Sequence, residues 1–170
     1  MIVPDQIRGR HKSLEEAVLK GAWPTLKAAR GKVVFLMDQR PVGPVYLQGH
    51  ESLAGRVIFT NAEAGQPDCA FTEENDGSQQ VIAALVHKGY LVRTRTDADT
   101  KEARINDTIH RDLALASGAQ FLSTDYPTSE PSPWSAYSVG FPGSAVARCN
   151  PVNGPHDCSN TDFVRSRAED

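Results

Sequence analysis

The fold is decided by residues 89–127, which read GYLVRTRTDADTKEARINDTIHRDLALASGAQFLSTDYP. Residues 90–96 alternate in character and are rich in Val and Thr, as β-strands are. Apolar side chains at every third or fourth position then predict a helix that stops at Gly118. A second short strand follows at 120–124. Because this strand–helix–strand unit is long enough for a crossover, it predicts two parallel strands joined in the right-handed sense.

The helix expected over 99–118 carries two sequence signals. Asp99 and Glu102 have the Asp-x-x-Glu form of a capping box, which satisfies free N–H groups at a helix start. The apolar face expected to be buried comprises Ile105, Ile109, Leu113 and Ala116.

The rest of the chain supplies the remaining elements. Ser13 and Glu16 form another capping box, and Ser78 precedes a helix that ends at Gly89 with an apolar face of Val81, Ile82, Leu85 and Val86. The nearly continuous apolar run at 32–38 is typical of a strand buried on both faces. In total we expect helices at 13–20, 25–30, 78–89 and 99–118, and strands at 32–38, 56–60, 69–72, 90–96 and 120–124.

Charge and hydropathy exclude several classes of protein. The chain has 170 residues and a formal net charge of −3, so no basic surface indicates nucleic-acid binding. No apolar run approaches the roughly 20 residues that a membrane-spanning helix needs. Residues 1–8 offer no apolar stretch for a signal peptide, which by itself indicates a cytoplasmic protein.

Four segments resemble a known family. Residues 31–38 read GKVVFLMD, residues 92–104 read VRTRTDADTKEAR, and residues 148–151 read RCNP. Together they are similar to the bacterial calcium-dependent phosphoinositide phospholipases C. Residues 118–127, GAQFLSTDYP, resemble the last strand of the wider phospholipase C-like phosphodiesterase superfamily, which includes glycerophosphodiester phosphodiesterases. The resemblance extends from about residue 21 to residue 158.

The resemblance implies an α/β fold, a partial TIM-type (β/α) barrel. A complete barrel of about 250 residues uses about 30 residues per unit, so this chain has room for about the last five strands of eight. Residues 1–158 would form this C-terminal part of the barrel, and residues 159–170 a polar, disordered tail. Met1 would be an internal start or the beginning of a fragment. The open edges of such a sheet favour self-association.

The chemistry that the resemblance implies needs groups from the early strands. In the family, two histidines act as general base and general acid, the substrate's own 2-hydroxyl attacks phosphorus, and Ca²⁺ neutralises the phosphoryl charge. We therefore assign no catalytic residue to this chain and expect its calcium ligands mostly outside it. The histidines are expected at the surface, with His50 as the one outside candidate: His11, His50, His87, His110 and His156.

The substrate-binding residues implied by the resemblance lie at strand ends. Arg93 and Arg95 are two apart on one strand and share a face, so they would bind a phosphate. An internal ion-pair network with Asp97, Asp99 or Asp125 is the alternative. Asp38 would bind a ring hydroxyl or calcium, and Asp125 and Tyr126 would supply an acceptor and an aromatic wall, or form a simple turn.

An acidic cluster at residues 73–76 invites comparison with a calcium site. It comprises Glu73, Glu74, Asn75 and Asp76. It lacks the spacing of an EF-hand loop, so a solvated loop and helix entry is the preferred interpretation.

The three cysteines leave more than one state open. Cys149 and Cys158 bracket a turn-rich loop and would be reduced thiols in a cytosolic protein, or zinc ligands with His156, although that spacing matches no common zinc motif. The resemblance implies a disulfide between Cys149 and Cys158 and a secreted protein. Cys69 is expected to be a buried free thiol.

The sequence thus predicts part of an enzyme that cleaves phosphatidylinositol to diacylglycerol and an inositol phosphate at a membrane surface, inactive as this chain alone. Two alternatives remain: a non-catalytic module that binds an inositol phosphate or a sugar, and a glycerophosphodiester phosphodiesterase-like hydrolase with another headgroup preference.

Overall fold

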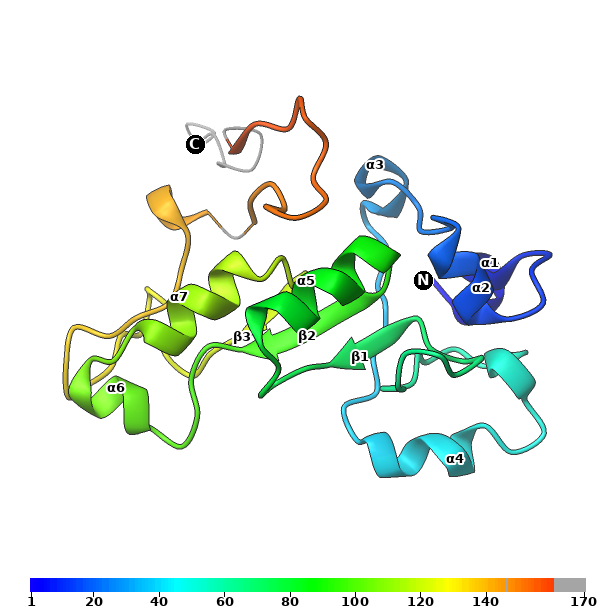
Figure 1. Ribbon diagram of the computed structural model, residues 1–170, viewed down its shortest axis with the longest axis horizontal. Helices are drawn as coiled ribbons and strands as arrows, with labels where there is room; N and C mark the ends of the chain where they lie inside the picture. The colour runs from blue at the N-terminus through cyan, green and yellow to red at the C-terminus, as the bar shows by residue number, and fades with distance from the viewer. Residues whose placement is uncertain (146, 161–170) are drawn as a thin grey trace. The chain divides into compact units, whose positions relative to one another are not determined.

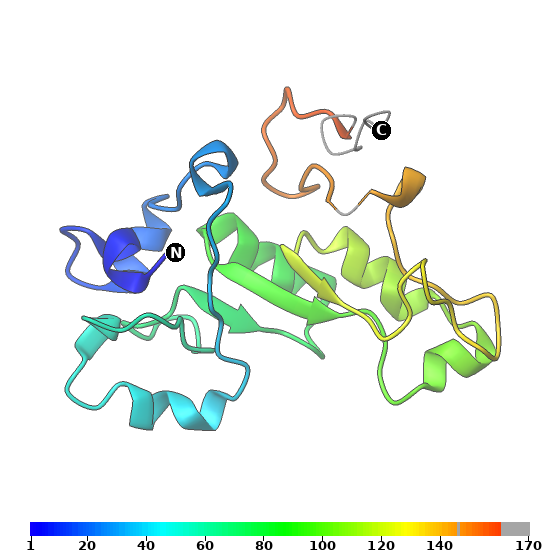
Figure 2. The same ribbon diagram turned by 180° about the vertical axis from the view of Figure 1, so that it is seen from behind.

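The computed structural model describes residues 1–145 and 147–160, which form two compact units. The first unit comprises Met1–Glu74 and Ala84–Arg93, and the second comprises Asn75–Ala83 and Thr94–Asp170. Figure 1 labels the elements along the chain, and Figure 2 shows them from behind. The chain combines helices with a small parallel sheet, so it is an α/β protein.

Short helices make up most of the first unit. They are α1 (Pro4–Arg8), α2 (Leu14–Leu19), α3 (Leu26–Ala29), η1 (Arg40–Val42), α4 (Gly43–Tyr46) and η2 (Glu51–Leu53). The predicted cap of α2 is confirmed, because the Ser13 side chain accepts a hydrogen bond from the Glu16 N–H at 3.0 Å. The helix predicted at 25–30 is also present as α3, with Thr25 as its cap.

Three of the five predicted strands form a small parallel sheet. They are β1 (Phe71–Glu73), β2 (Leu91–Arg95) and β3 (Phe121–Ser123), in the order β1-β2-β3. β1 and β2 pair in parallel, with Glu73 opposite Arg93. The last residue of β1, Glu73, therefore lies beside Arg93 in the middle of β2.

The strands predicted at 32–38 and 56–60 are wrong as regular elements. These segments make isolated parallel bridges, Leu36 to Phe59 and Asn61 to Phe71. Val33 and Phe35 are exposed rather than buried on both faces. The physical reason is that an apolar run becomes a regular buried strand only where other elements cover it. Val33 and Phe35 are not covered, and in 56–60 only Phe59 and Thr60 are buried.

The helix α5 (Gln79–Lys88) follows its sequence signals closely. The Ser78 hydroxyl accepts a hydrogen bond from the Val81 N–H at 3.3 Å. Gly89 ends the helix at φ +101°, and a Cβ there would lie 2.5 Å from the Val18 carbonyl oxygen. Only glycine fits this position. Of the predicted apolar face, Ile82 and Val86 are buried whereas Val81 is exposed.

The single helix predicted over 99–118 is wrong. It is divided into α6 (Lys101–Ile105) and α7 (Ile109–Ala116). Asn106 adopts a left-handed conformation between them, and the Asp107 carboxylate accepts the Ile109 N–H at 2.9 Å. Asn and Asp side chains bond nearby backbone in this way and so compete with a continuous helix.

The predicted buried face and capping box of this region also need correction. Ile105, Ile109 and Leu113 are exposed. Glu102 accepts the Ala98 N–H at 3.1 Å instead of closing a box with Asp99, and Thr100 is the residue that precedes α6.

The chain after β3 is anchored by aromatic rings. Tyr126, Tyr137 and Val139 form a buried cluster with Ala103, and the Tyr137 hydroxyl donates to the Thr96 carbonyl oxygen at 2.8 Å. A disulfide joins Cys149 to Cys158, with a Cα–Cα distance of 5.9 Å. Beyond residue 160, the predicted tail lies outside the described residues.

Candidate functional site at the strand ends

The side chains of β2 alternate between two faces. Val92 and Thr94 are buried, whereas Arg93 and Arg95 project to the opposite face and are partly exposed. The prediction that the two arginines share a face is confirmed. Arg93 belongs to the first unit and Arg95 to the second, so the surroundings of each are described separately.

Arg93 lies between two carboxylates. Its Nη1 atom is 3.2 Å from Glu73 Oε2 and 3.6 Å from Asp38 Oδ1. Asp38 is largely exposed, whereas the Glu73 side chain is 11 % exposed. Asp38 and Arg93, predicted separately as substrate-binding residues, therefore lie in contact, a pairing that the sequence did not predict. Glu73, which the sequence had placed in a solvated acidic loop, is the nearly buried last residue of β1.

A network of amide and guanidinium groups fixes the backbone at Asp38 and Glu73. Asn61 Oδ1 accepts hydrogen bonds from the Glu73 N–H and from Arg40 Nη2, both at 3.1 Å, and Asn61 Nδ2 donates to the Asp38 carbonyl oxygen at 3.0 Å. Sequence reasoning missed both Asn61 and Arg40. Each follows a predicted strand within two residues, and this position was the signal that could have identified them.

The Glu73 carboxyl group binds its proton more tightly than an exposed glutamate does. Burial raises the pKa of Glu73 from 4.5 to about 7, and the hydrogen bond to Asp38 acts in the same direction, while Arg93 opposes both. Strongly shifted pKa values are concentrated at functional sites. This cluster of Asp38, Glu73 and Arg93 is the candidate functional site of the first unit.

The Glu73 shift predicts how stability depends on pH. Because the folded-state pKa of about 7 lies above 4.5, the folded protein binds the proton more tightly, and stability falls as pH rises from about 4.5 to about 7. Glu73→Gln is expected to remove about 2–3 kcal/mol of this decline, measured by urea unfolding between pH 4.5 and 8. Glu63→Gln, at an exposed carboxylate, is the control. An unchanged pH slope in Glu73→Gln would contradict the assignment.

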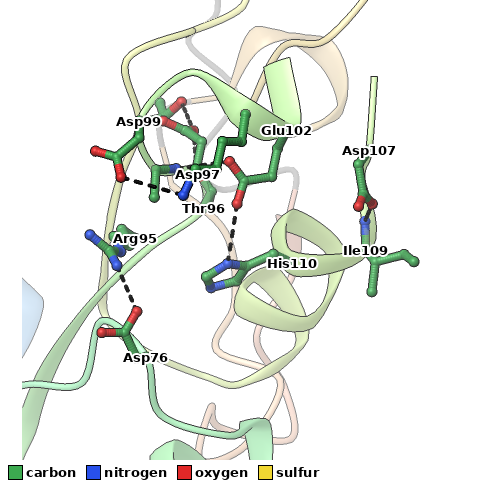
Figure 3. Close-up of polar contacts among 12 residues, drawn as sticks. Asp76, Arg95, Thr96, Asp97, Asp99, Glu102, Asp107, Ile109 and His110 are labelled. Carbon is green, nitrogen blue, oxygen red and sulfur yellow. Dashed lines mark hydrogen bonds and ion pairs between the residues drawn. The ribbon is translucent and has the colours of Figure 1, made fainter. Parts of the chain in front are cut away.

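Arg95 makes a single close ion pair in the second unit. Its Nη2 atom is 2.6 Å from Asp76 Oδ1, and Asp76 is largely exposed (Figure 3). The Arg95 Nε atom is buried and has no hydrogen-bond partner among the described residues. This ion pair involves none of the three alternative partners considered from the sequence, which were Asp97, Asp99 and Asp125.

Asp97 holds the end of β3. Its carboxylate accepts hydrogen bonds from the Thr96 hydroxyl at 2.8 Å, the Thr124 hydroxyl at 2.6 Å and the Asp125 N–H at 3.0 Å. Asp97 is buried. The backbone that presents Asp125 and Tyr126 is thus fixed to the end of β2, as the shared edge of parallel strands predicts.

Asp125 and Tyr126 differ in their surroundings. The Asp125 side chain is exposed. The Tyr126 ring is buried and meets Tyr137 and Trp134 edge to face, at 5.9 Å and 6.3 Å between ring centroids. Their assignment to substrate binding stays a prediction.

The histidines do not form a catalytic pair in any recorded contact. The His50 ring contacts the Ala54 carbonyl oxygen at 2.7 Å. His110 lies 4.0 Å from Glu102 and is partly buried rather than fully solvated (Figure 3).

Comparison with known proteins identifies the family of this chain. A model of the family described as "Phosphoinositide phospholipase C, Ca2+-dependent" matches residues 1–151. The chain belongs to the calcium-dependent phosphoinositide phospholipase C family. No curated protein and no solved structure matches it.

The family to which this phospholipase C chain belongs is calcium-dependent. No group of three or more His, Cys, Asp or Glu side chains among the described residues is arranged to hold a metal ion. Calcium takes six to eight oxygen ligands, and the two carboxylates that do meet, Asp38 and Glu73, are already paired with Arg93. The described donor set therefore does not fit a calcium ion, and no catalytic step is assigned through one.

Two further properties of the phospholipase C chain concern its environment. None of the described helices is both long and apolar enough to cross a membrane.

Burial raises the pKa of the free Cys69 thiol to about 12, so this cysteine is unreactive, as expected for a buried thiol.

Proposed function

We propose that this chain is the substrate-binding part of a secreted phosphoinositide phospholipase C that cleaves phosphatidylinositol to diacylglycerol and an inositol phosphate. The observation that carries the proposal is the contact of Arg93 with Glu73, on the neighbouring parallel strand, and with Asp38, in a chain that belongs to the phospholipase C family. Arginine binds phosphate with two parallel hydrogen bonds, and carboxylates accept hydrogen bonds from ring hydroxyls.

The parallel pairing supports a barrel-like origin for this arrangement. The bridges Leu36–Phe59 and Asn61–Phe71 and the pairing of β1 with β2 are all parallel and follow chain order. Consecutive parallel neighbours are characteristic of (β/α) barrels, whose sites lie at the carboxyl ends of the strands. In the proposed protein these segments are the later strands of such a barrel.

The roles of the chain's own residues follow from their positions. Arg93 would leave its carboxylate partners for the phosphate oxygens and stabilise the charge that develops on them. Asp38 and Glu73 would then accept hydrogen bonds from hydroxyl groups of the headgroup. The histidines that exchange protons in this reaction are proposed to come from outside residues 1–170.

The proposal is tested with phosphatidylinositol vesicles and calcium. We expect the purified 170-residue chain to bind inositol 1-phosphate and to release no diacylglycerol. Turnover by this chain would contradict the assignment of the catalytic histidines elsewhere. Failure to bind inositol 1-phosphate would contradict the substrate-binding role.

A second candidate is a non-catalytic module that binds an inositol phosphate or a sugar, and it is favoured by a site that offers arginine and carboxylates without a histidine pair. Such a module would self-associate through its open sheet edges. Sedimentation at several protein concentrations, together with hydrolysis assays on glycerophosphocholine and phosphatidylinositol, separates it from both hydrolase candidates.

The disulfide between Cys149 and Cys158 supports export, because such bonds persist in oxidising compartments.

A further inference from the structure

The two short helices α6 and α7 of the second unit expose apolar side chains to solvent. Ile105 is 76 % exposed and Ile109 69 %. Leu113, four residues after Ile109 on the same face of α7, is 48 % exposed. Figure 3 shows Ile109 projecting away from His110, whose ring faces Glu102. The spacing is that of a buried face, but the described chain leaves it uncovered, and contiguous exposed apolar side chains mark interaction sites.

Trp134 extends this apolar patch. The Arg104 guanidinium lies over the indole ring, 4.1 Å from its centroid, and Trp134 is 47 % exposed. The hydroxyls of Ser132 and Ser135 donate to the Ala103 carbonyl oxygen at 3.0 Å and 2.6 Å. These bonds hold the segment that carries Trp134 against α6, so the half-exposed indole is fixed beside that helix.

The charges around the patch largely cancel. Lys101 and Arg104 are the cations of α6, and the exposed carboxylate of Asp99 lies 3.8 Å from Lys101. The Asp107 carboxylate accepts the Ile109 N–H at 2.9 Å. Because these charges create no strong field of one sign, a partner must be recognised mainly through its apolar groups.

The size of the patch discriminates between two kinds of partner. A stable protein interface buries about 800 Å² on each side. A large aromatic side chain buries only about 150–250 Å², so one half-exposed Trp and three aliphatic side chains fall short of that area. A lipid bilayer has no such requirement, because a few apolar side chains bind reversibly among its acyl chains while Trp, Lys and Arg lie at the level of the headgroups.

We propose that the patch of Ile105, Ile109, Leu113 and Trp134 inserts into the surface of a phospholipid bilayer. The aliphatic side chains enter the acyl region, and the Trp134 indole lies at headgroup level with Arg104. This docking rests on the proposed function, whose substrate is a membrane lipid, and it assigns the face of the second unit that meets the membrane.

Vesicles of phosphatidylcholine test the patch independently of Arg93, because this lipid carries no inositol. In a Trp23→Phe background, Trp134 is the only tryptophan of the chain. We expect its fluorescence emission to move to shorter wavelength and to saturate as vesicles are added to the 170-residue chain. Binding is expected to persist in concentrated salt, which screens exposed charges but not apolar contacts.

Two variants and a matched control identify the residues that insert. Ile105→Gln and Ile109→Gln place a polar side chain at exposed positions, so both variants are expected to fold. Each is expected to weaken vesicle binding about tenfold, because the burial of one aliphatic side chain is lost. Leu26→Gln, at a leucine that is 73 % exposed in the first unit, is expected to bind vesicles as the unsubstituted chain does.

Four results would overturn the proposal. They are no saturable change in Trp134 emission, unchanged vesicle affinity in the Ile105→Gln/Ile109→Gln double variant, an equal loss in Leu26→Gln, and a dimer in sedimentation without vesicles that the double variant abolishes. The last result would assign the patch to a second copy of the chain. Failure of the proposed function is distinguishable, because it is a failure to bind inositol 1-phosphate, and the double variant is expected to bind that ligand normally.

Discussion

Asp97→Ala is expected to destabilise the second unit by about 3–5 kcal/mol, because it removes a buried carboxylate that accepts three hydrogen bonds and leaves their donors unpaired. The donors are the hydroxyls of Thr96 and Thr124 and the N–H of Asp125. These bonds join the end of β2 to the segment after β3, so their loss releases the backbone that carries Asp125 and Tyr126.

The second unit can be monitored separately. Trp23 lies in the first unit and Trp134 in the second, so a Trp23→Phe background leaves Trp134 as the fluorescent reporter during urea unfolding. Asp97→Asn, which retains one acceptor oxygen but not the charge, is expected to fall between wild type and Asp97→Ala.

Asp99→Asn is the matched control for this prediction. Asp99 is largely exposed, and its recorded cation, Lys101, is 3.8 Å away, so its replacement is expected to change stability by about 0.5 kcal/mol or less. A loss below about 1 kcal/mol in Asp97→Ala would mean that the carboxylate does not hold the strand ends together.

The sequence predicted the region from Ser78 to Arg95 well because its local signals agree with one another. Ser78 caps α5, Gly89 ends it where only glycine fits against Val18, and alternation marks β2. Each signal lies within a short stretch of sequence, and the close approach of Val18 to Gly89 agrees with them.

Predictions from the sequence were wrong where an element forms only if other parts of the chain cover it. The run at 32–38 has the composition of a buried strand, but Val33 and Phe35 are exposed and only an isolated bridge forms at Leu36 within it. The spacing of Ile105 and Ile109 predicted a continuous helix. It gave less weight to the left-handed conformation of Asn106 and to the bond of the Asp107 carboxylate with the Ile109 N–H, which divide the helix.

Only part of the candidate site was predicted from the sequence. Asp38 and Arg93 were found because residues at strand ends are exposed to an active edge. Glu73 was assigned to solvent because it begins an acidic run, yet its pairing opposite Arg93 in the sheet buries it. Asn61 and Arg40 reach the site by side-chain contacts across 21 and more positions of sequence, and their position just after predicted strands was the local signal for them.

Arg93→Ala is expected to weaken binding of inositol 1-phosphate to the 170-residue chain by about 30-fold, because a charge-assisted hydrogen bond to phosphate contributes about 2 kcal/mol. Arg93→Lys keeps the charge but not the planar pair of donors and is expected to lose about tenfold. Isothermal titration calorimetry measures both. Arg8→Lys, at another partly buried arginine that pairs with a carboxylate, serves as the control and should bind normally.

A double-mutant cycle with Glu73→Gln separates substrate binding from simple charge neutralisation. Arg93 contacts Glu73 at 3.2 Å, so Arg93→Ala also leaves a nearly buried carboxylate without its cation. If neutralising Glu73 were the whole role of Arg93, the loss on Arg93→Ala would disappear in the Glu73→Gln background. If Arg93 contacts the phosphate, Arg93→Ala costs the same factor in both backgrounds, and this second outcome is the one we expect.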